Sequence, residues 1–339
     1  MTPRFPGTWR TPRRLAVTLP SAPRPARGVS RGRQLPARRP DAASKSQFAE
    51  DAPGRPLLVA IDIDGTLLDT QGLLRPVVRD AVRTVAASGV EVLLATGRSP
   101  WDGVAEIAAD LGLDGPQITM QGALISDPAT GSIRRLRALP PDVYLDAVAF
   151  ARELQLDPIA TLLDGHRAEH IAEDADGFWR AHDGPGHLVG EPDLTSLASE
   201  TPIRLFLPTG PERHWSVRLA AVERFRGRAA VVWSDLSGIE LLAPGTNKGE
   251  AVAWFATGRG ISLDEVAAVG DAANDKELLR LAGRSAAMGS ATADVREAAH
   301  VVVRSSSDDG LVDALRWFFP DLADNLGVQG LFAGLHLLA

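Results

Sequence analysis

Cysteine is absent from this 339-residue chain. Its absence excludes disulfides, thiolate metal sites and cysteine nucleophiles. Long hydrophobic runs are also missing, since no apolar stretch approaches the roughly 18 residues that a membrane-spanning helix requires. The chain shows no His-Glu-x-x-His zinc pattern and no evident Ser–His–Asp or Ser–Lys arrangement. We expect a cytoplasmic location and no membrane partner.

Positive charge is scarce beyond residue 50. The first 50 residues hold ten Arg and one Lys against Asp41 and Glu50, a net charge of +9. The remaining residues hold 25 basic and 41 acidic side chains, a net charge of −16. Such an acidic body gives no support for nucleic-acid binding by the folded part of the chain.

Residues 1–54 are rich in arginine and proline and show no hydrophobic periodicity. This composition cannot bury enough apolar surface to offset the entropy of ordering, so we expect a disordered leader. A targeting peptide or a nucleic-acid-binding arm is one interpretation of its charge. We favour a flexible leader, or an upstream stretch translated from an early start codon, because no apolar or amphipathic helix is visible.

From Leu57 onward, short apolar runs alternate with segments of helical periodicity. The predicted strands are 57–61, 90–95, 117–120, 266–269 and 301–303, and the predicted helices are 76–88, 101–111, one after Lys248, one opening at Asn274, and 311–318. Alternation of this kind is typical of βαβ units. We therefore predict an α/β fold with a Rossmann-like parallel sheet as its core.

A second set of elements fills the middle of the chain. It comprises predicted helices at 141–154 and 212–226, strands at 158–163, 203–207, 229–233 and 238–242, and a loop-rich stretch at 164–193. These elements suffice for a separate small α/β domain at 137–240. The core would then comprise residues 55–136 and 241–320, followed by a C-terminal extension at 321–339.

Two carboxylates, Asp62 and Asp64, end the first apolar run and are followed at once by Gly65. An unpaired carboxylate inside a strand is costly, whereas the carboxyl edge of an open α/β sheet is where ligands bind. With an ordinary pKa of ~3.9, Asp62 is ionised at neutral pH and could attack phosphorus without a base. Asp64, beyond the turn, could protonate the leaving alcohol and later deprotonate water.

The remaining polar clusters also follow apolar strands or open helices. Carboxylates with no His or Cys nearby favour Mg²⁺ over zinc, and Asp271 would be a further ligand beside Asp62. Asn274 and Asp275 lie one helical turn beyond Asp271 and could orient its carboxylate and the metal's waters. The turn at Thr96 suits phosphate oxygens, and Lys248 suits the charge of the transition state.

These clusters resemble the four motifs of the haloacid dehalogenase superfamily, over about residues 57–320. The corresponding segments of this chain are, in order, Asp62-Ile-Asp-Gly-Thr-Leu-Leu-Asp69, Ala95-Thr-Gly-Arg98, Lys248 and Gly270–Asp275. The resemblance implies Asp62 as nucleophile, Asp64 as acid/base, and Mg²⁺ held by Asp62, the Asp64 carbonyl and Asp271. It also implies a phosphate- and substrate-binding group formed by Thr96, Gly97, Arg98, Lys248 and Asn274.

The spacing of the motifs narrows the resemblance to one subgroup of the superfamily. Asp62 and Thr96 are 34 residues apart, whereas Thr96 and Lys248 are 152 apart, which leaves room for the 137–240 insert. This arrangement is similar to the Cof-type phosphatases, whose α/β cap lies between the second and third motifs. The chain departs from them at Gln121, where the family usually has Asn, and at Ala272, where a small turn residue such as Gly or Ser is common.

Five histidines, at positions 166, 170, 182, 187 and 214, fall within the insert. They could select the substrate from above the site, but we favour solvated loop and helix-face positions for them.

The leading hypothesis is a Mg²⁺-dependent phosphatase that acts on small phosphorylated metabolites, sugar phosphates among them, through a phosphoaspartate. A phosphomutase on a sugar phosphate is the second. A binding or regulatory protein that uses its basic leader is the third. The physiological substrate and the oligomeric state stay open.

Overall fold

The computed structural model describes residues 54–171, 188–326 and 336–337. The predicted leader therefore lies outside the described residues, apart from Gly54. Within the described ranges, no helix is both long enough and apolar enough to cross a membrane.

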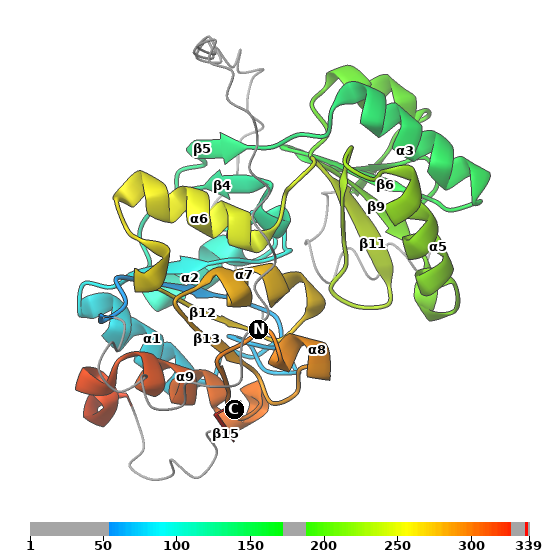
Figure 1. Cartoon of the computed structure of the whole chain (residues 1–339). Helices are drawn as coiled ribbons and strands as arrows, with labels where there is room; N and C mark the ends of the chain where they lie inside the picture. The colour runs from blue at the N-terminus through cyan, green and yellow to red at the C-terminus, as the bar shows by residue number, and fades with distance from the viewer. Residues whose placement is uncertain (1–53, 172–187, 327–335, 338–339) are drawn as a thin grey trace, which may run out of the picture. The chain divides into compact units, whose positions relative to one another are not determined.

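The core is a six-stranded sheet with the order β15-β14-β13-β12-β1-β2. Figure 1 labels β12 and β13 within it. Its strands are β1 (Leu58–Ile61), β2 (Glu91–Leu94), β12 (Val266–Gly270), β13 (Arg284–Ala287), β14 (Val301–Val302) and β15 (His336–Leu337). All neighbours pair in parallel except β14 and β15. The predicted parallel core is confirmed, although β13 and β15 were not foreseen.

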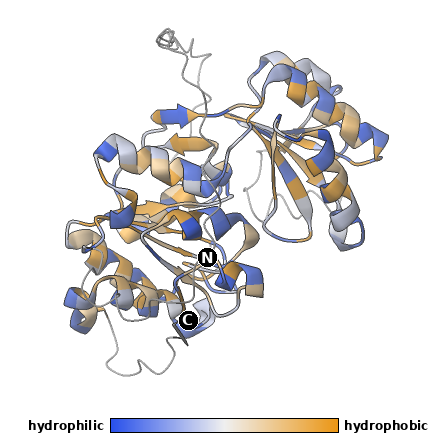
Figure 2. Cartoon of the chain, in the orientation of Figure 1, coloured by the Kyte–Doolittle hydropathy of each residue, from blue (hydrophilic) through white to orange (hydrophobic). Residues whose placement is uncertain are grey.

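Helices cover both faces of this sheet, because successive strand residues point to opposite sides. Val59 and Ile61 pack against α1 (Pro76–Ala87), α2 (Val104–Leu111) and α9 (Gly310–Phe318). Leu58 and Ala60 pack against α6 (Lys248–Arg259) and α7 (Lys276–Leu281). Figure 1 shows α1 and α9 on one side and α6 and α7 on the other, and Figure 2 shows the hydrophobic colour of the strands between them.

Several predicted boundaries shift in the structure. Helix α2 begins at Val104 instead of Trp101, because Gly103 before it has a left-handed backbone. The helix predicted to open at Asn274 starts as a 3-10 turn, Ala273–Asp275, before α7. The other short elements are η3 (Leu263–Glu265), α8 (Ala293–Arg296), η5 (Ser306–Asp308) and η6 (Pro320–Asn325).

The predicted third core strand pairs differently from expectation. β3 (Gln117–Thr119) joins β2 only through a bridge between Ala95 and Ile118. It forms instead a three-stranded antiparallel sheet with β4 (Leu124–Ser126) and β5 (Ile133–Leu136), neither of which was foreseen. The 3-10 turn η1 (Met120–Gly122) links β3 to β4.

The insert has its own six-stranded sheet, in the order β10-β11-β9-β6-β7-β8. Its strands are β6 (Ile159–Leu162), β7 (Gly165–Ala168), β8 (Leu188–Gly190), β9 (Arg204–Pro208), β10 (Ala230–Val232) and β11 (Gly238–Leu242). The stretch 164–193, predicted as loop-rich, thus contains β7 and β8, while 172–187 lie outside the described residues. We call this domain the cap.

Helices cover one face of the cap sheet. Leu205, Leu207, Ile239 and Leu241 pack with α3 (Pro141–Glu153), α5 (Gly210–Arg224) and η2 (Leu194–Ser199) in one apolar cluster. Alternation along β9 and β11 places Arg204 and Glu240 on the opposite face. Both side chains are buried nonetheless, so the core must cover them.

Candidate active site

The site forms where β1 and β12 end side by side. Ile61 pairs with Val269, and the backbone N–H of Asp62 donates to the carbonyl of Val269. Asp62 and Asp271 therefore leave adjacent parallel strands at the same sheet edge, the place where open α/β sheets bind ligands. This is the juxtaposition that the sequence predicted.

Lys248 lies between two carboxylates. Asn247 caps α6 by accepting from the N–H of Glu250, which fixes Lys248 as the first helical residue. The Lys248 Nζ is 2.6 Å from Asp62 Oδ1 and 2.7 Å from Asp275 Oδ1. Its side chain is 1% exposed, so the ammonium group is a buried counter-charge.

Asp275 is the other anchor of the cluster. Its second oxygen, Oδ2, accepts hydrogen bonds from the backbone N–H groups of Asp271 and Ala272. With both oxygens engaged, Asp275 fixes the turn that carries Asp271. Asp271 is held further by Thr66, whose hydroxyl donates to Oδ1 at 3.1 Å.

Crowding of negative charge perturbs the titration of the cluster. Burial, and next the Asp275 carboxylate, raise the pKa of Asp62 well above its ordinary value, against the opposing effect of Lys248. Burial and Asp275 likewise raise the pKa of Asp271 to about 6. Burial alone would lower the pKa of Lys248, but Asp275 and Asp62 hold it above its ordinary value. The site thus has more negative charge than one ammonium group balances.

The residues fit a divalent cation. Asp62, Asp271 and Asp275 each offer a carboxylate oxygen, and the three oxygens lie within 4.8 Å of one another. Hard oxygen donors without imidazole or thiolate are the ligands of Mg²⁺. The buried Oδ1 of Asn274 has no hydrogen-bond partner and could accept one from a water of the ion. Asp62 and Asp271 are the candidate metal ligands, and Asp275 holds the backbone of the turn that carries Asp271.

Gly65 allows the chain to turn over this cluster. Its φ is +78°, a conformation that L side chains rarely adopt, and a Cβ there would lie 2.4 Å from Asp271 Oδ2. Any larger residue would displace the Asp271 carboxylate.

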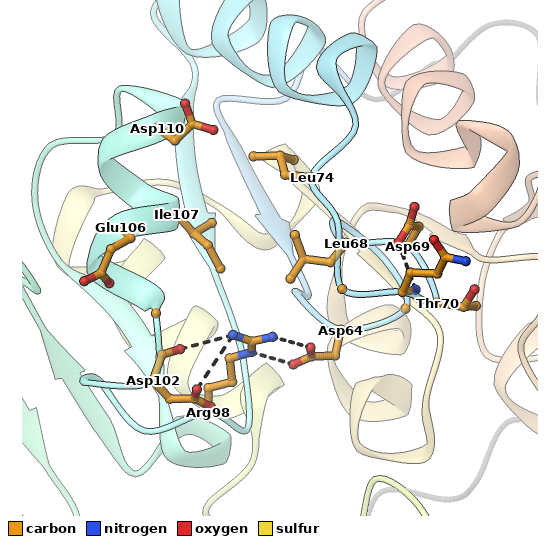
Figure 3. Close-up of a pocket in the computed structure, with 14 residues that line it drawn as sticks. Asp64, Leu68, Asp69, Thr70, Leu74, Arg98, Asp102, Glu106, Ile107 and Asp110 are labelled. Atoms are coloured by element: carbon orange, nitrogen blue, oxygen red, sulfur yellow. Dashed lines mark hydrogen bonds and ion pairs between the residues drawn. The ribbon is translucent and has the colours of Figure 1, made fainter. Parts of the chain in front are cut away.

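Asp64 pairs with Arg98. Arg98 Nε and Nη2 donate to the two carboxylate oxygens at 2.8 and 2.6 Å. A third donor, Nη1, reaches the carbonyl of Asp102 at 3.1 Å. Figure 3 shows the Asp64–Arg98–Asp102 interactions at the wall of a pocket of about 840 Å³. Arg98, predicted to bind substrate, is thus a partner of the predicted acid/base.

Thr96 follows β2, the strand beside β1. Its hydroxyl accepts from the N–H of Arg98, and its carbonyl accepts from the N–H of Gln121. Gly97 passes directly over Gln121, since a Cβ at Gly97 would lie 2.4 Å from Gln121 Nε2. The predicted phosphate turn therefore rests on the Met120–Gly122 segment.

Asn274 faces the cap. Its Nδ2 donates to Gln121 Oε1 and to Ser234 Oγ, each at 2.9 Å. Sequence reasoning missed Ser234, Arg204 and Glu240, which belong to the cap and lie within the same network. Charged residues alternating with apolar ones in predicted strands were the available signal.

The cap histidines were expected in solvated positions, which is wrong for two of them. His166 and His214 are fully buried, and His166 Nδ1 lies 2.9 Å from Thr161 Oγ1. His170 is exposed, as predicted, beside Asp157. His182 and His187 lie outside the described residues.

Comparisons with known proteins agree with this geometry. Residues 59–315 match the model of the haloacid dehalogenase-like hydrolases. A Bacillus subtilis phosphatase is 26% identical over 281 residues, covering 76% of this chain and 98% of its own. A 5-amino-6-(5-phospho-D-ribitylamino)uracil phosphatase of the same species is 27% identical over 262 residues. The match covers 76% of this chain and 94% of the relative. A solved sugar phosphatase of subclass IIB superposes with a TM-score of 0.69 at 21% identity, covering 77% and 98%.

Proposed function

The chain belongs to the haloacid dehalogenase-like hydrolases, and from that premise we propose that it is a Mg²⁺-dependent phosphatase whose nucleophile is Asp62. Support comes from the arrangement of Asp62, Asp271, Asp275 and Lys248 at the carboxyl edge of the core sheet. The phosphatases to which the chain is similar are consistent with this class of reaction.

In the first step, an Asp62 carboxylate oxygen attacks phosphorus and the bond to the leaving alcohol breaks. The alcohol oxygen takes its proton from Asp64. In the second step, Asp64 removes a proton from water, which attacks phosphorus and releases phosphate from Asp62. Because Asp64 accepts two hydrogen bonds from Arg98, it must leave that pair to serve either step.

Positive charge supports both steps. Bound Mg²⁺, held by Asp62, Asp271 and the Asp64 carbonyl, would offset the repulsion between the Asp62 carboxylate and the phosphate dianion. Lys248 keeps Asp62 oriented through its hydrogen bond to Oδ1 and contributes charge beside the reacting group. Thr96 and the N–H groups that follow it would hold phosphate oxygens.

We propose small phosphorylated metabolites as substrates, with sugar phosphates or related polyol phosphates as the first to assay. The cap is consistent with this size class, because its Arg204 side chain covers the segment that follows Thr96 by donating to the Gly97 carbonyl and the Ser99 hydroxyl. One relative acts on a ribityl phosphate by its name, and a structural neighbour is a sugar phosphatase.

The observation that carries the proposal is the buried Lys248–Asp62 pair beside Asp271. Asp62→Asn should abolish hydrolysis of a generic aryl phosphate while circular dichroism shows an intact fold. Asp127→Asn, in an exposed turn, is the control and should retain turnover. Hydrolysis that persists in Asp62→Asn, or that ignores removal of Mg²⁺ by a chelator, would overturn the proposal.

A further inference from the structure

A chain of buried hydrogen bonds leaves the core at Gln121, crosses the cap and returns to the core. Gln121 Nε2 donates to Glu240 Oε1 at 2.7 Å, and Glu240 Oε2 accepts from Arg204 Nη1 at 2.8 Å. Arg204 Nη1 also donates to the carbonyl of Gly97 at 3.0 Å, and Nη2 donates to Ser99 Oγ at 3.2 Å. We call Gln121, Glu240 and Arg204 the bridge.

Both core ends of the bridge contact residues that we propose to bind phosphate. At one end, Gln121 Oε1 accepts from Asn274, and the Gln121 N–H donates to the carbonyl of Thr96. At the other end, Arg204 donates to the carbonyl of Gly97, the residue that follows Thr96. The cap thus contacts the Thr96 turn and Asn274 through one connected set of hydrogen bonds.

Forming the bridge costs free energy, because it buries charged side chains and holds two residues in an unfavourable backbone conformation. Arg204 and Glu240 side chains are only 7% and 10% exposed, so the ion pair has lost most of its hydration. Met120 and Gln121 have φ values of +49° and +59°, in the left-handed region that disfavours residues other than glycine. Strained backbone persists where its surroundings hold it, and it concentrates at functional sites.

The length of the Gln121 side chain is central to this arrangement. One amide oxygen accepts from Asn274 in the core, while the amide nitrogen donates to Ser234 and Glu240 in the cap. Asn, one methylene shorter, could not serve both sides from the same backbone position. The departure noted at this position therefore has a structural counterpart in the cap.

We propose that Gln121, Glu240 and Arg204 are positioning residues that seat the cap on the core and thereby hold Thr96 and Asn274 in their phosphate-binding geometry. The second half of the proposal rests on the proposed function. The first half, cap seating, stands apart from any activity.

The test compares Gln121→Asn and Glu240→Gln with wild type in the full chain. Glu240→Gln keeps the size of the side chain. Its amide nitrogen is a donor, however, and must face a donor of either Gln121 or Arg204. Gln117→Asn is the matched control, because Gln117 is an equally buried glutamine whose amide binds Leu94 N–H and the Gly115 carbonyl. Thermal melts confirm that each variant is folded.

The position of the cap on the core is measured as the distance between two spin labels. One label is attached at Ser216→Cys in the cap and the other at Thr257→Cys in the core, and both positions are exposed. The chain has no native cysteine to compete for label. We expect one narrow distance distribution in the wild type and in Gln117→Asn, and a broadened or second population in both bridge variants. Unchanged distributions in both bridge variants would overturn cap seating, whether or not the protein hydrolyses any ester.

Kinetic measurements test the second half of the proposal, that the bridge holds Thr96 and Asn274 in their phosphate-binding geometry. We expect kcat for an aryl phosphate to fall about tenfold to a hundredfold in the bridge variants, as small misplacements of catalytic groups do. Gln117→Asn should stay within about twofold of wild type. In the double variant, the losses should not multiply, because the two residues act through one contact. Wild-type kcat in folded bridge variants would overturn the positioning role and leave the proposed phosphatase intact. Absence of hydrolysis by the wild type would overturn the proposed function instead.

Discussion

Replacing Lys248 with methionine removes the buried counter-charge from the site while preserving most of its volume. Lys248, Asp62 and Asp275 side chains are 1%, 6% and 0% exposed, so water cannot compensate for the lost ammonium group. Removing one partner of a buried pair costs about 3–5 kcal/mol, a large part of the 5–15 kcal/mol that stabilises a typical protein. We expect Lys248→Met to lose that amount in metal-free buffer at neutral pH, measured by urea unfolding.

The loss should shrink in mildly acidic buffer. Burial raises the pKa of Asp62, and Lys248 is among the groups that lower it, so the variant's carboxyl should titrate at a still higher pH. The folded variant then binds protons that the unfolded chain does not, and its stability rises as the pH falls toward about 5. Lys276→Met, which breaks an exposed pair with Asp294, is the control and should cost under about 1 kcal/mol. Equal losses in the two variants, or a Lys248→Met loss independent of pH, would show that Lys248 is not the counter-charge of the buried carboxylates.

Four further outcomes are expected. Mg²⁺ at about 100 times its dissociation constant should stabilise the protein by about 2.7 kcal/mol at neutral pH, seen as a higher Tm than in chelator. Without metal, Tm should fall as the pH rises from about 4 through about 6, since the raised pKa of Asp271 makes its contribution largest at low pH; a flat profile would contradict this. Gly65→Ala should weaken Mg²⁺ binding by calorimetry, whereas Gly72→Ala, with a similar φ and nothing within 4 Å, should not. Product analysis should find free phosphate, and an isomerised ester in its place would indicate a mutase.

The acidic cluster was predictable because its geometry follows from strand order alone. Apolar runs that end in Asp62 and Asp271 read as parallel strands, and the carboxyl ends of parallel strands share one edge. Lys248 was equally accessible, since Asn247 marks the start of its helix. In these places, local sequence signals and the global fold point the same way.

The bridge was not predictable, because it depends on pairings between distant segments. The register of β11 with β9, in which Glu240 pairs with Phe206, brings Glu240 close to Arg204. Arg204 in turn reaches Gly97 only across the junction of cap and core. The antiparallel β3–β4–β5 sheet was missed for a related reason. Its strands span three or four residues each, too few to show a period.

Asp64 shows a different limit. Its position two residues after Asp62 identified it as a candidate acid/base, but spacing cannot reveal which partner a side chain takes. In the structure it pairs with Arg98, another predicted site residue, at 2.6 Å. Whether and when that pair opens depends on substrate and metal, which sequence does not encode.

The proposed reaction requires that Asp62 becomes phosphorylated during turnover. The most direct measurement is acid quenching of the Asp64→Asn variant during reaction with an aryl phosphate, followed by peptide mass analysis. That variant keeps the nucleophile but lacks the group proposed to activate water, so the intermediate should accumulate. We predict one phosphoryl group on the peptide that contains Asp62, absent when Asp62 is also replaced by Asn. Release of the aryl alcohol with no adduct on that peptide, or an adduct on another residue, would show that Asp62 is not the nucleophile.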